Sequence, residues 1–200
     1  KTVTVYGQTE VTKDLYDAIE KSNGIVFNDA KDVMPQKINS EKPFVTFKKD
    51  GLEKTINCDF VVGCDGFHGI SRSVIPQEVI KKYERTYPFG WLGILSETPP
   101  ASDELIYANH GNGFALASMR NKNLSRYYIQ TPLEDHVDNW NDKKFWDALK
   151  RRLPSNISDN IITGPSIEKS IAPLRSFVCE PMSWKKLYLV GDAAHIVPPT

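Results

Sequence analysis

The chain has 200 residues, 40% of them hydrophobic and 25% charged, a composition typical of a globular protein with one or two domains and a sizeable core. Its 25 Lys and Arg residues balance its 25 Asp and Glu residues, so no overall charge favours nucleic acid or an anionic membrane as a partner. No apolar stretch approaches the roughly 18 residues that a bilayer-spanning helix needs, so no membrane segment is predicted.

The first predicted elements are a helix and a small antiparallel sheet. Apolar residues recur at helical spacing from Gln8 to about Lys21, and Gly24 is predicted to end that helix. A β meander is predicted next, over residues 25–27, 32–38, 44–49 and 54–62. The Asp50-Gly51 pair supplies the hairpin turn before its last strand.

From about residue 80 the pattern changes to longer strands. They are predicted over residues 87–95, 104–110, 113–120 and 125–132, separated by Pro, Gly and Asn signals. Asn141 or Asp142 is placed to cap a helix over residues 143–153, and Pro154 would end it. Further strands are predicted over residues 166–178 and 187–190. This order indicates two interleaved domains, the first of which resumes near residue 176.

A glycine-rich turn follows the predicted strand that ends near residue 62. Gly63, Gly66 and Gly69 surround Asp65 and allow close backbone approach or positive φ angles. Ser71 is placed to cap a short helix whose first amides would face a phosphate. The glycines fall three apart, which is not the G-x-G-x-x-G spacing. A tight turn with a hydrogen-bonded aspartate is an equal alternative.

A second group of polar side chains is predicted on a hairpin that turns at Gly111-Asn112. If His110 opposes Gly113, then Tyr107 opposes Leu116, and alternate residues of the following strand share the face of Tyr107. Should the next strand pair in the same sense, one surface gathers Tyr107, Ser118, Arg120, Arg126 and Tyr128.

These residue types suit a carboxylate ligand, since an arginine fork and hydroxyl donors bind it by charge-assisted hydrogen bonds. A tyrosine on the same face could accept or relay a proton from a phenolic hydroxyl. The alternative is the solvated face of an antiparallel sheet, where Arg, Ser and Tyr are common.

The cysteines and histidines do not indicate a metal centre. Cys58, Cys64 and Cys179 are odd in number and fit no ligand spacing, and His195 has no partners at such a spacing either. No metal site is therefore predicted. Unpaired cysteines favour a reducing, cytoplasmic location. The basic run at 150–152 would complement the dipole at the end of the predicted helix.

The two glycine-rich stretches together resemble a known family. "GCDGFHGISRSVIP" and "LYLVGDAAHIVPPT" resemble the Asp-Gly and Gly-Asp motifs of the single-component, FAD-dependent aromatic hydroxylases, the class A flavoprotein monooxygenases. "YPFGWLGIL", "ELIYANH", "SRYYIQ" and "SIAPLRSF" resemble the segments between these motifs in one branch of the family, and "KTVTVYGQTEVT" the segment before them. The resemblance covers essentially the whole chain.

The resemblance implies an α+β, partly α/β fold in which part of an FAD-binding domain is interleaved with a substrate domain built on an antiparallel β-sheet. Residues 1–79 and 176–200 would belong to the FAD-binding domain, and residues 80–175 to the substrate domain. Family members also carry a G-x-G-x-x-G dinucleotide fold, so this chain is expected to be the middle of a larger enzyme and inactive alone. Homodimer formation is implied as well.

The resemblance implies a cofactor-binding role for each residue that matches such a position in the family. Asp192 matches an aspartate that binds the ribityl chain of FAD, Gln8 matches a glutamine that contacts FAD, and Asp65 is implied in handling both FAD and the pyridine nucleotide. Three basic residues match positions implicated in NADPH binding: His68, Arg72 and Arg175.

For the substrate, the resemblance implies that Ser118, Arg120 and Tyr128 hold the carboxylate of an aromatic acid. Tyr107 matches a tyrosine that bonds the 4-hydroxyl and favours the phenolate. Arg126 matches an arginine implicated in flavin movement and charge balance, and Pro199 a proline beside the reacting ring.

The implied activity is the NADPH- and O2-dependent hydroxylation of 4-hydroxybenzoate to 3,4-dihydroxybenzoate. Three alternatives stay open. A related flavin hydroxylase would act on another aromatic acid, and a non-catalytic module would bind an aromatic acid or a partner without flavin. A nicotinamide dehydrogenase is least favoured, because its dinucleotide fingerprint is not found here.

Overall fold

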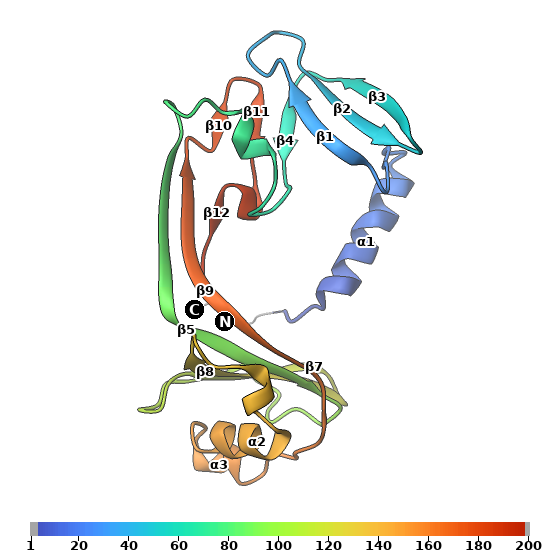
Figure 1. Cartoon of the computed structure of the whole chain (residues 1–200). Coiled ribbons are helices and arrows are strands. Elements are labelled where there is room, and N and C mark those ends of the chain that lie inside the picture. The colour runs from blue at the N-terminus through green and yellow to red at the C-terminus, as the bar shows by residue number, and fades with distance from the viewer. Residues whose placement is uncertain (1–3, 199–200) are drawn as a thin grey trace. The chain divides into compact units, whose positions relative to one another are not determined.

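The structure is a computed structural model and describes residues 4–198 (Figure 1). It divides into two compact units: the chain up to Asn23 with Tyr87–Leu174, and Gly24–Thr86 with the chain from Arg175 on. Each unit is thus built from two separate stretches, whereas the prediction divided only the FAD-binding domain in this way. The unit boundaries are not those of the predicted domains, whose functional assignment stays a prediction.

Helix α1 (Gln8–Lys21) confirms the first predicted helix. Glu10 lies in its first turn and Lys21 in its last, where each charge complements the helix dipole. The helix ends before Gly24, because Asn23 already has a positive φ of 57° and leaves the helical path.

A six-stranded sheet has the strand order β12-β9-β5-β8-β7-β6. Its strands are β5 (Lys81–Ser96), β6 (Ile106–Ala108), β7 (Ala115–Asn121), β8 (Leu124–Pro132), β9 (Ser166–Glu180) and β12 (His195–Ile196). Along β8 buried residues alternate strictly with partly exposed ones. That period of two places one face of the strand in the core and leaves the other for polar side chains.

Helix α2 (Asp142–Lys150) provides most of the cover for the core face of this sheet. Asn141 is its N-cap and accepts a 2.8 Å hydrogen bond from the amide of Lys144, which decides between the two predicted caps. Phe145 and Leu149 are fully buried in the core that this helix shares with the sheet, and each stabilises the fold by roughly 1.5–3 kcal/mol.

The chain beyond α2 differs from its prediction in one respect. Pro154 does not end α2 but precedes the short helix α3 (Ser155–Ser158), since its fixed φ suits a helix start. Arg152 donates to the Ala148 carbonyl of α2, as a cation at a helix C-terminus should, and also to the Asn112 carbonyl of the β6–β7 turn. A short 3₁₀ turn, η2 (Val137–Asn139), precedes α2.

The second unit holds two three-stranded sheets. Strands β1 (Lys31–Gln36), β2 (Phe44–Lys49) and β3 (Leu52–Asn57) form an antiparallel meander. In the other sheet β11 (Leu187–Leu189) pairs in parallel with β4 (Val61–Gly63) and antiparallel with β10 (Ser183–Trp184). The two predicted glycine-rich turns therefore follow adjacent parallel strands, and lead into the 3₁₀ turns η1 (Ser71–Val74) and η3 (Gly191–Ala193).

Two strand predictions in this unit are wrong. Residues 25–27 are not a strand; Phe27 instead packs its ring on Phe47 at a centroid distance of 5.0 Å. The strand predicted over residues 54–62 is two strands in different sheets, because the chain leaves the meander after Asn57. Among residues 4–198, no helix is long and apolar enough to cross a membrane.

Candidate functional site

Strand register confirms the polar face that alternation predicted on the sheet of the first unit. Tyr107 on β6 pairs with Leu116 on β7, and Leu116 pairs in turn with Tyr128 on β8. Ser118 pairs with Arg126 in the same way. Because paired residues point to the same side, the side chains of Tyr107, Ser118, Arg126 and Tyr128 share one face. The register shifts between Met119 and Asn121, so alternation does not extend to Arg120.

Aromatic rings form a continuous band along this face. The rings of Trp91 and Phe114 are stacked with centroids 5.0 Å apart and an interplanar angle of 14°. Tyr107 lies beyond Phe114 at 5.8 Å, and Tyr128 beyond Trp91 at 5.5 Å. Such a band offers a flat apolar surface on which an aromatic ligand ring could pack.

A hollow of about 610 Å³ opens beside the polar face, within the first unit. Side chains of β7, β8 and β9 line it together with the start of α1, where Gln8 is exposed. Its charged lining residues are Glu10, Arg120, Arg126 and Glu168. The structure therefore brings Gln8, Arg120, Arg126 and Tyr128 to one hollow, although the sequence placed Gln8 in a different domain.

Arg126 is the best-anchored cation of the hollow. Its Nη1 lies 3.0 Å from the Glu168 carboxylate, and its Nε donates to the Tyr128 hydroxyl over 3.1 Å. Burial opposes the charge, but the hydrogen bonds to Glu168 and Tyr128 outweigh it and raise the pKa of Arg126. The guanidinium is therefore charged at every pH that the protein tolerates.

Arg120 differs from Arg126 in having no such anchor. Within residues 4–198, no hydrogen bond or ion pair engages its guanidinium, which is exposed at the end of β7. Ser118 is nearly buried, at 8% exposure, and Tyr107 is 53% exposed. The hollow is thus lined by a free arginine fork and the Tyr128 hydroxyl, whereas Tyr107 and Ser118 do not line it, and the Ser118 hydroxyl donates to the Met119 carbonyl.

In the second unit, Asp65 has a structural partner. Its Oδ2 accepts a 2.8 Å hydrogen bond from the amide of Ser71, the first residue of η1. The prediction that Ser71 caps a helix facing a phosphate is therefore wrong: Ile70 is the N-cap of η1, Ser71 lies inside it, and Asp65 satisfies the Ser71 amide. A Cβ on Gly69 would lie 2.1 Å from the Asp65 Cγ, so the glycine makes room for this carboxylate.

Arg72 joins the two glycine-rich turns. Its Nη1 donates to the carbonyls of Asp192, at 3.2 Å, and Ala193, at 2.8 Å, while its Nη2 donates to the Phe67 carbonyl. These bonds fix η3 against the turn after β4, so they position the backbone that carries Asp192. Most of the guanidinium is occupied in this way.

Asp192 follows Gly191, whose φ of 64° turns the chain sharply after β11. The Asp192 side chain is exposed, and no residue in the described range bonds its carboxylate. A free carboxylate at the end of a parallel strand can accept hydrogen bonds from ligand hydroxyls, and a polyol chain is such a ligand. This arrangement fits a ribityl group.

His68, Arg72 and Arg175 gather around the ring of Phe67. The guanidinium carbons of Arg72 and Arg175 lie 5.1 and 4.6 Å from its centroid, and the His68 ring meets it edge-on at 4.9 Å. Arg175 also bonds Glu84 at 3.4 Å. The three predicted NADPH-binding residues therefore form one basic cluster, in which Arg72 has mainly backbone partners.

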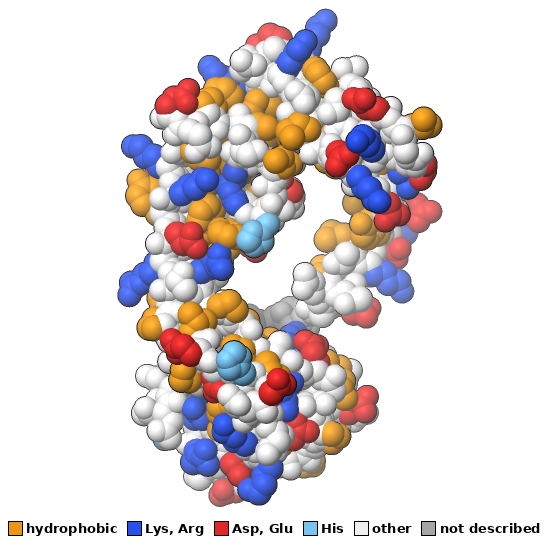
Figure 2. All heavy atoms as spheres, in the orientation of Figure 1, with side chains coloured by type: hydrophobic (Ala, Val, Ile, Leu, Met, Phe, Trp, Pro, Cys, Tyr) orange, Lys and Arg blue, Asp and Glu red, His pale blue; other side chains and the backbone are white. Residues whose placement is uncertain are grey.

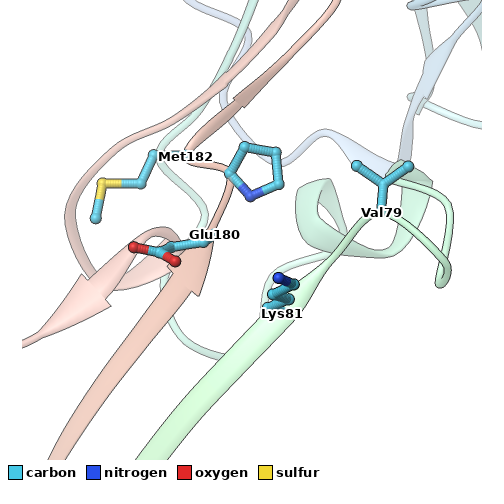
Figure 3. Close-up of a pocket in the computed structure, with 5 residues that line it drawn as sticks. Val79, Lys81, Glu180 and Met182 are labelled. Carbon is cyan, nitrogen blue, oxygen red and sulfur yellow. The ribbon is translucent and has the colours of Figure 1, made fainter.

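A further hollow, of about 500 Å³, lies where β5 and β9 meet the turn of Pro181. Figure 3 shows Lys81 and Glu180 on these neighbouring strands, with Val79 and Met182 beside them. No predicted site residue lines it. On the face drawn in Figure 2, Lys and Arg side chains are mixed with Asp and Glu rather than gathered by sign.

Comparison with protein families decides the affiliation. The sequence profile of the FAD-binding domain family matches residues 1–200. The chain belongs to this family.

The chain is 57% identical over all 200 residues to a curated relative, the p-hydroxybenzoate hydroxylase of Acinetobacter baylyi (strain ATCC 33305 / BD413 / ADP1). The chain covers 49% of that relative's length, so it spans about half of the protein it matches. The family affiliation and the predicted resemblance therefore agree.

Solved structures confirm the fold. The flavin-dependent halogenase CmlS matches 97% of this chain with a TM-score of 0.73 at 18% identity, over 36% of its own length. The p-nitrophenol 4-monooxygenase PnpA from Pseudomonas putida DLL-E4 matches 97% with a TM-score of 0.72 at 13% identity, over 49% of its length. The chain thus has the predicted fold of flavin monooxygenases, with mixed helices and antiparallel sheets.

Several residues of the site were not predicted from sequence. Glu168 and Trp91 were given no role from sequence, and only the three-dimensional structure places them beside the polar residues. Gly93, inside a predicted strand, did carry a signal, since a glycine there often marks close approach of another group. Pro199, predicted beside the reacting ring, lies outside the described residues.

Proposed function

We propose that the protein containing this chain is an FAD-dependent monooxygenase that hydroxylates 4-hydroxybenzoate to 3,4-dihydroxybenzoate with NADPH and O2. One observation carries the proposal: a nearly buried serine and two tyrosines share one sheet face along an aromatic band, and a free arginine fork lines the hollow beside that face. The 57% identity to a p-hydroxybenzoate hydroxylase supports it.

Substrate binding is assigned to the polar face. Arg120, Ser118 and Tyr128 would hold the carboxylate of 4-hydroxybenzoate, because a guanidinium fork and two hydroxyls supply convergent donors. The aromatic band would pack against the substrate ring. Glu168 already balances the charge of Arg126. Arg126 would therefore influence the electrostatic potential at the substrate ring and the flavin, and would not bind the carboxylate.

Tyr107 is assigned to the phenolic end of the substrate. Its hydroxyl would accept a hydrogen bond from the 4-hydroxyl and so favour loss of that proton, which makes the ring more electron-rich. Pro199 is proposed beside the reacting carbon, on the family resemblance alone. The overall reaction consumes one O2, one NADPH and one proton, and returns hydroxylated product, NADP⁺ and water.

The cofactors are proposed on the same basis. The Asp192 carboxylate would accept hydrogen bonds from the ribityl hydroxyls of FAD, and Gln8 would contact FAD from the start of α1. Asp65 would act indirectly, by holding the turn after β4. FAD, when bound, supplies the redox chemistry that takes electrons from NADPH and activates oxygen. The basic cluster of His68, Arg72 and Arg175 would attract the NADPH phosphates.

The proposal also covers the domains, the oligomeric state and the cellular location of the enzyme. Residues 1–79 and 176–200 are assigned to its FAD-binding domain and residues 80–175 to its substrate domain. A homodimer in the cytoplasm, without membrane or nucleic-acid partners, is part of the proposal, and the three free cysteines agree with a reducing compartment. Sedimentation of the full-length protein tests the dimer.

The deciding experiment is NADPH oxidation by the full-length protein with added FAD, in the presence and absence of 4-hydroxybenzoate, with identification of the aromatic product. Formation of 3,4-dihydroxybenzoate in step with NADPH consumption supports the proposal. Stimulated oxidation that yields only peroxide points to another aromatic acid as substrate. Lack of both stimulation and bound flavin favours a binding module instead.

A further inference from the structure

Glu168 and Tyr128 hold Arg126 at two different nitrogens of its guanidinium. The Glu168 side chain, on β9, is 54% exposed, whereas the Arg126 side chain is only 13% exposed. The guanidinium is therefore fixed between a carboxylate at Nη1 and a phenolic oxygen at Nε. No motif and no predicted role accounts for Glu168.

The direction of these hydrogen bonds limits where the proton of the Tyr128 hydroxyl can be donated. A guanidinium can only donate, so the Tyr128 oxygen must accept from Arg126. The proton of the Tyr128 hydroxyl then has to be donated elsewhere, and no acceptor for it exists among residues 4–198. An oxygen of a ligand in the hollow would satisfy it.

The charged residues around the hollow indicate different roles for its two arginines. Glu10 and Glu168 are the acidic groups that line it, and Arg120 and Arg126 the basic ones. Glu168 forms an ion pair with Arg126, whereas Arg120 has no partner in the described range. Arg126 is thus held to orient Tyr128, and Arg120 is left to meet an anion.

We infer that Glu168 is a positioning residue for the substrate carboxylate, acting through Arg126 and the Tyr128 hydroxyl. This inference rests on the proposed function, since it takes an aromatic carboxylate as the ligand. Glu168 contributes an acceptor oxygen that keeps the Nε of Arg126 turned toward Tyr128, and the Tyr128 proton is thereby directed into the hollow. The acceptor, rather than the charge, is the essential feature.

Three substitutions of Glu168 separate the acceptor from the charge. Glu168→Gln keeps an acceptor oxygen at the same reach but removes the charge. Glu168→Asp keeps the charge but withdraws it by one methylene from a contact that is now 3.0 Å. Glu168→Ala removes both. Glu134→Ala, at an exposed residue beyond β8, is the matched control for loss of a carboxylate from the same unit.

The measurement is the Kd of 4-hydroxybenzoate for the full-length protein with FAD, by isothermal titration calorimetry, with a melting curve for each variant. Losing one charge-assisted bond to the carboxylate should weaken binding about tenfold in the Ala and Asp variants. The Gln variant should bind within about threefold of wild type. Glu134→Ala should match wild type.

Other outcomes overturn the inference. Tighter binding by both the Ala and Gln variants would mean that Glu168 acts only by opposing the charge of the ligand. Equal weakening of the Gln and Ala variants would make the charge essential instead of the acceptor, and unchanged binding by Glu168→Ala would leave Glu168 no role. If wild-type protein itself does not bind 4-hydroxybenzoate, the proposed substrate fails, and the inference with it.

Discussion

Gly93 on β5 lies directly opposite Tyr128 on β8, and the tyrosine ring lies across it. A Cβ at Gly93 would approach the Tyr128 Cε1 to 2.6 Å and its Cδ1 to 2.8 Å, closer than carbon atoms pack in proteins. The absence of a side chain at one strand position therefore determines where the hydroxyl on the neighbouring strand lies.

Gly93→Ala should displace the Tyr128 ring and weaken binding of 4-hydroxybenzoate by about tenfold, the equivalent of one hydrogen bond to a charged group. Titration calorimetry on the full-length protein checks this. Gly111→Ala is the matched control, because a Cβ at Gly111 meets nothing within 4 Å and its φ is not positive. If Gly93→Ala binds 4-hydroxybenzoate as tightly as Gly111→Ala, the Tyr128 ring can move without any effect on substrate binding.

Arg72→Ala should loosen the turn that carries Asp192. The substitution removes hydrogen bonds to the carbonyls of Asp192 and Ala193, and bonds from a charged donor contribute about 1.5–3 kcal/mol each in proteins. We expect a lower melting temperature and faster loss of FAD on dialysis. His68→Ala, at an exposed neighbour in the same cluster, should keep FAD. Normal FAD retention by Arg72→Ala would contradict a role in positioning Asp192.

The polar face could be predicted from sequence because its determinants are local. The Gly111-Asn112 turn sets the pairing of β6 with β7, and alternation then assigns Tyr107 and Ser118 to one side, whereas the register shifts at Arg120. The pairing with β8 follows from a tight turn after Asn121. Alternation therefore predicted the face on the condition that β7 and β8 pair with these sides together, and the register meets that condition.

Other features depend on contacts between distant parts of the chain. Ser71 was expected to cap a helix, but the Ser71 amide instead donates to the carboxylate of Asp65. Sequence alone does not show which side chain accepts the hydrogen bond from an amide at the start of this turn. The parallel pairing of β4 with β11 is likewise non-local. Glu168 meets Arg126 only because β9 and β8 flank the same strand, β5.

Stability should depend on pH through Asp142. Burial opposes its ionisation, but hydrogen bonds from Lys169 and Ser166 outweigh burial and lower the pKa of Asp142 to about 2. A carboxyl whose pKa is lower in the folded state stabilises the fold above its unfolded value of about 4, and this contribution is lost as the pH falls toward about 2.

Asp142→Asn should therefore lower the free energy of unfolding by about 1 kcal/mol at pH 7, a value reduced for the solvent exposure of this side chain. Urea unfolding of the full-length protein between pH 7 and pH 3 checks this, and the difference from wild type should shrink below about pH 4. Asp138→Asn, one turn earlier and without such partners, is the control. A difference that is constant with pH would assign the effect to packing.

Arg120→Lys should weaken binding of 4-hydroxybenzoate by about tenfold or more, since a point charge cannot reproduce the planar two-donor fork. The same calorimetric titration measures it. Arg151→Lys, an exposed arginine just past α2, should have no effect and controls for the substitution itself. Unchanged affinity for Arg120→Lys would remove Arg120 from the carboxylate site and transfer that role to Arg126.

Tyr107→Phe isolates the phenolic end of the substrate from its carboxylate end. The variant keeps the ring that contacts Phe114 but loses the hydroxyl, so packing of the aromatic band is preserved. Substrate affinity should change by less than about threefold, while hydroxylation slows by roughly a hundredfold or more, the usual size of a proton-handling contribution. Rapid-reaction kinetics with product analysis separates binding from hydroxylation, and Tyr83→Phe, on an exposed part of β5, is the control. A parallel loss of affinity and product would assign Tyr107 to binding, because a residue that acts only on the phenol proton cannot alter how tightly the carboxylate is held.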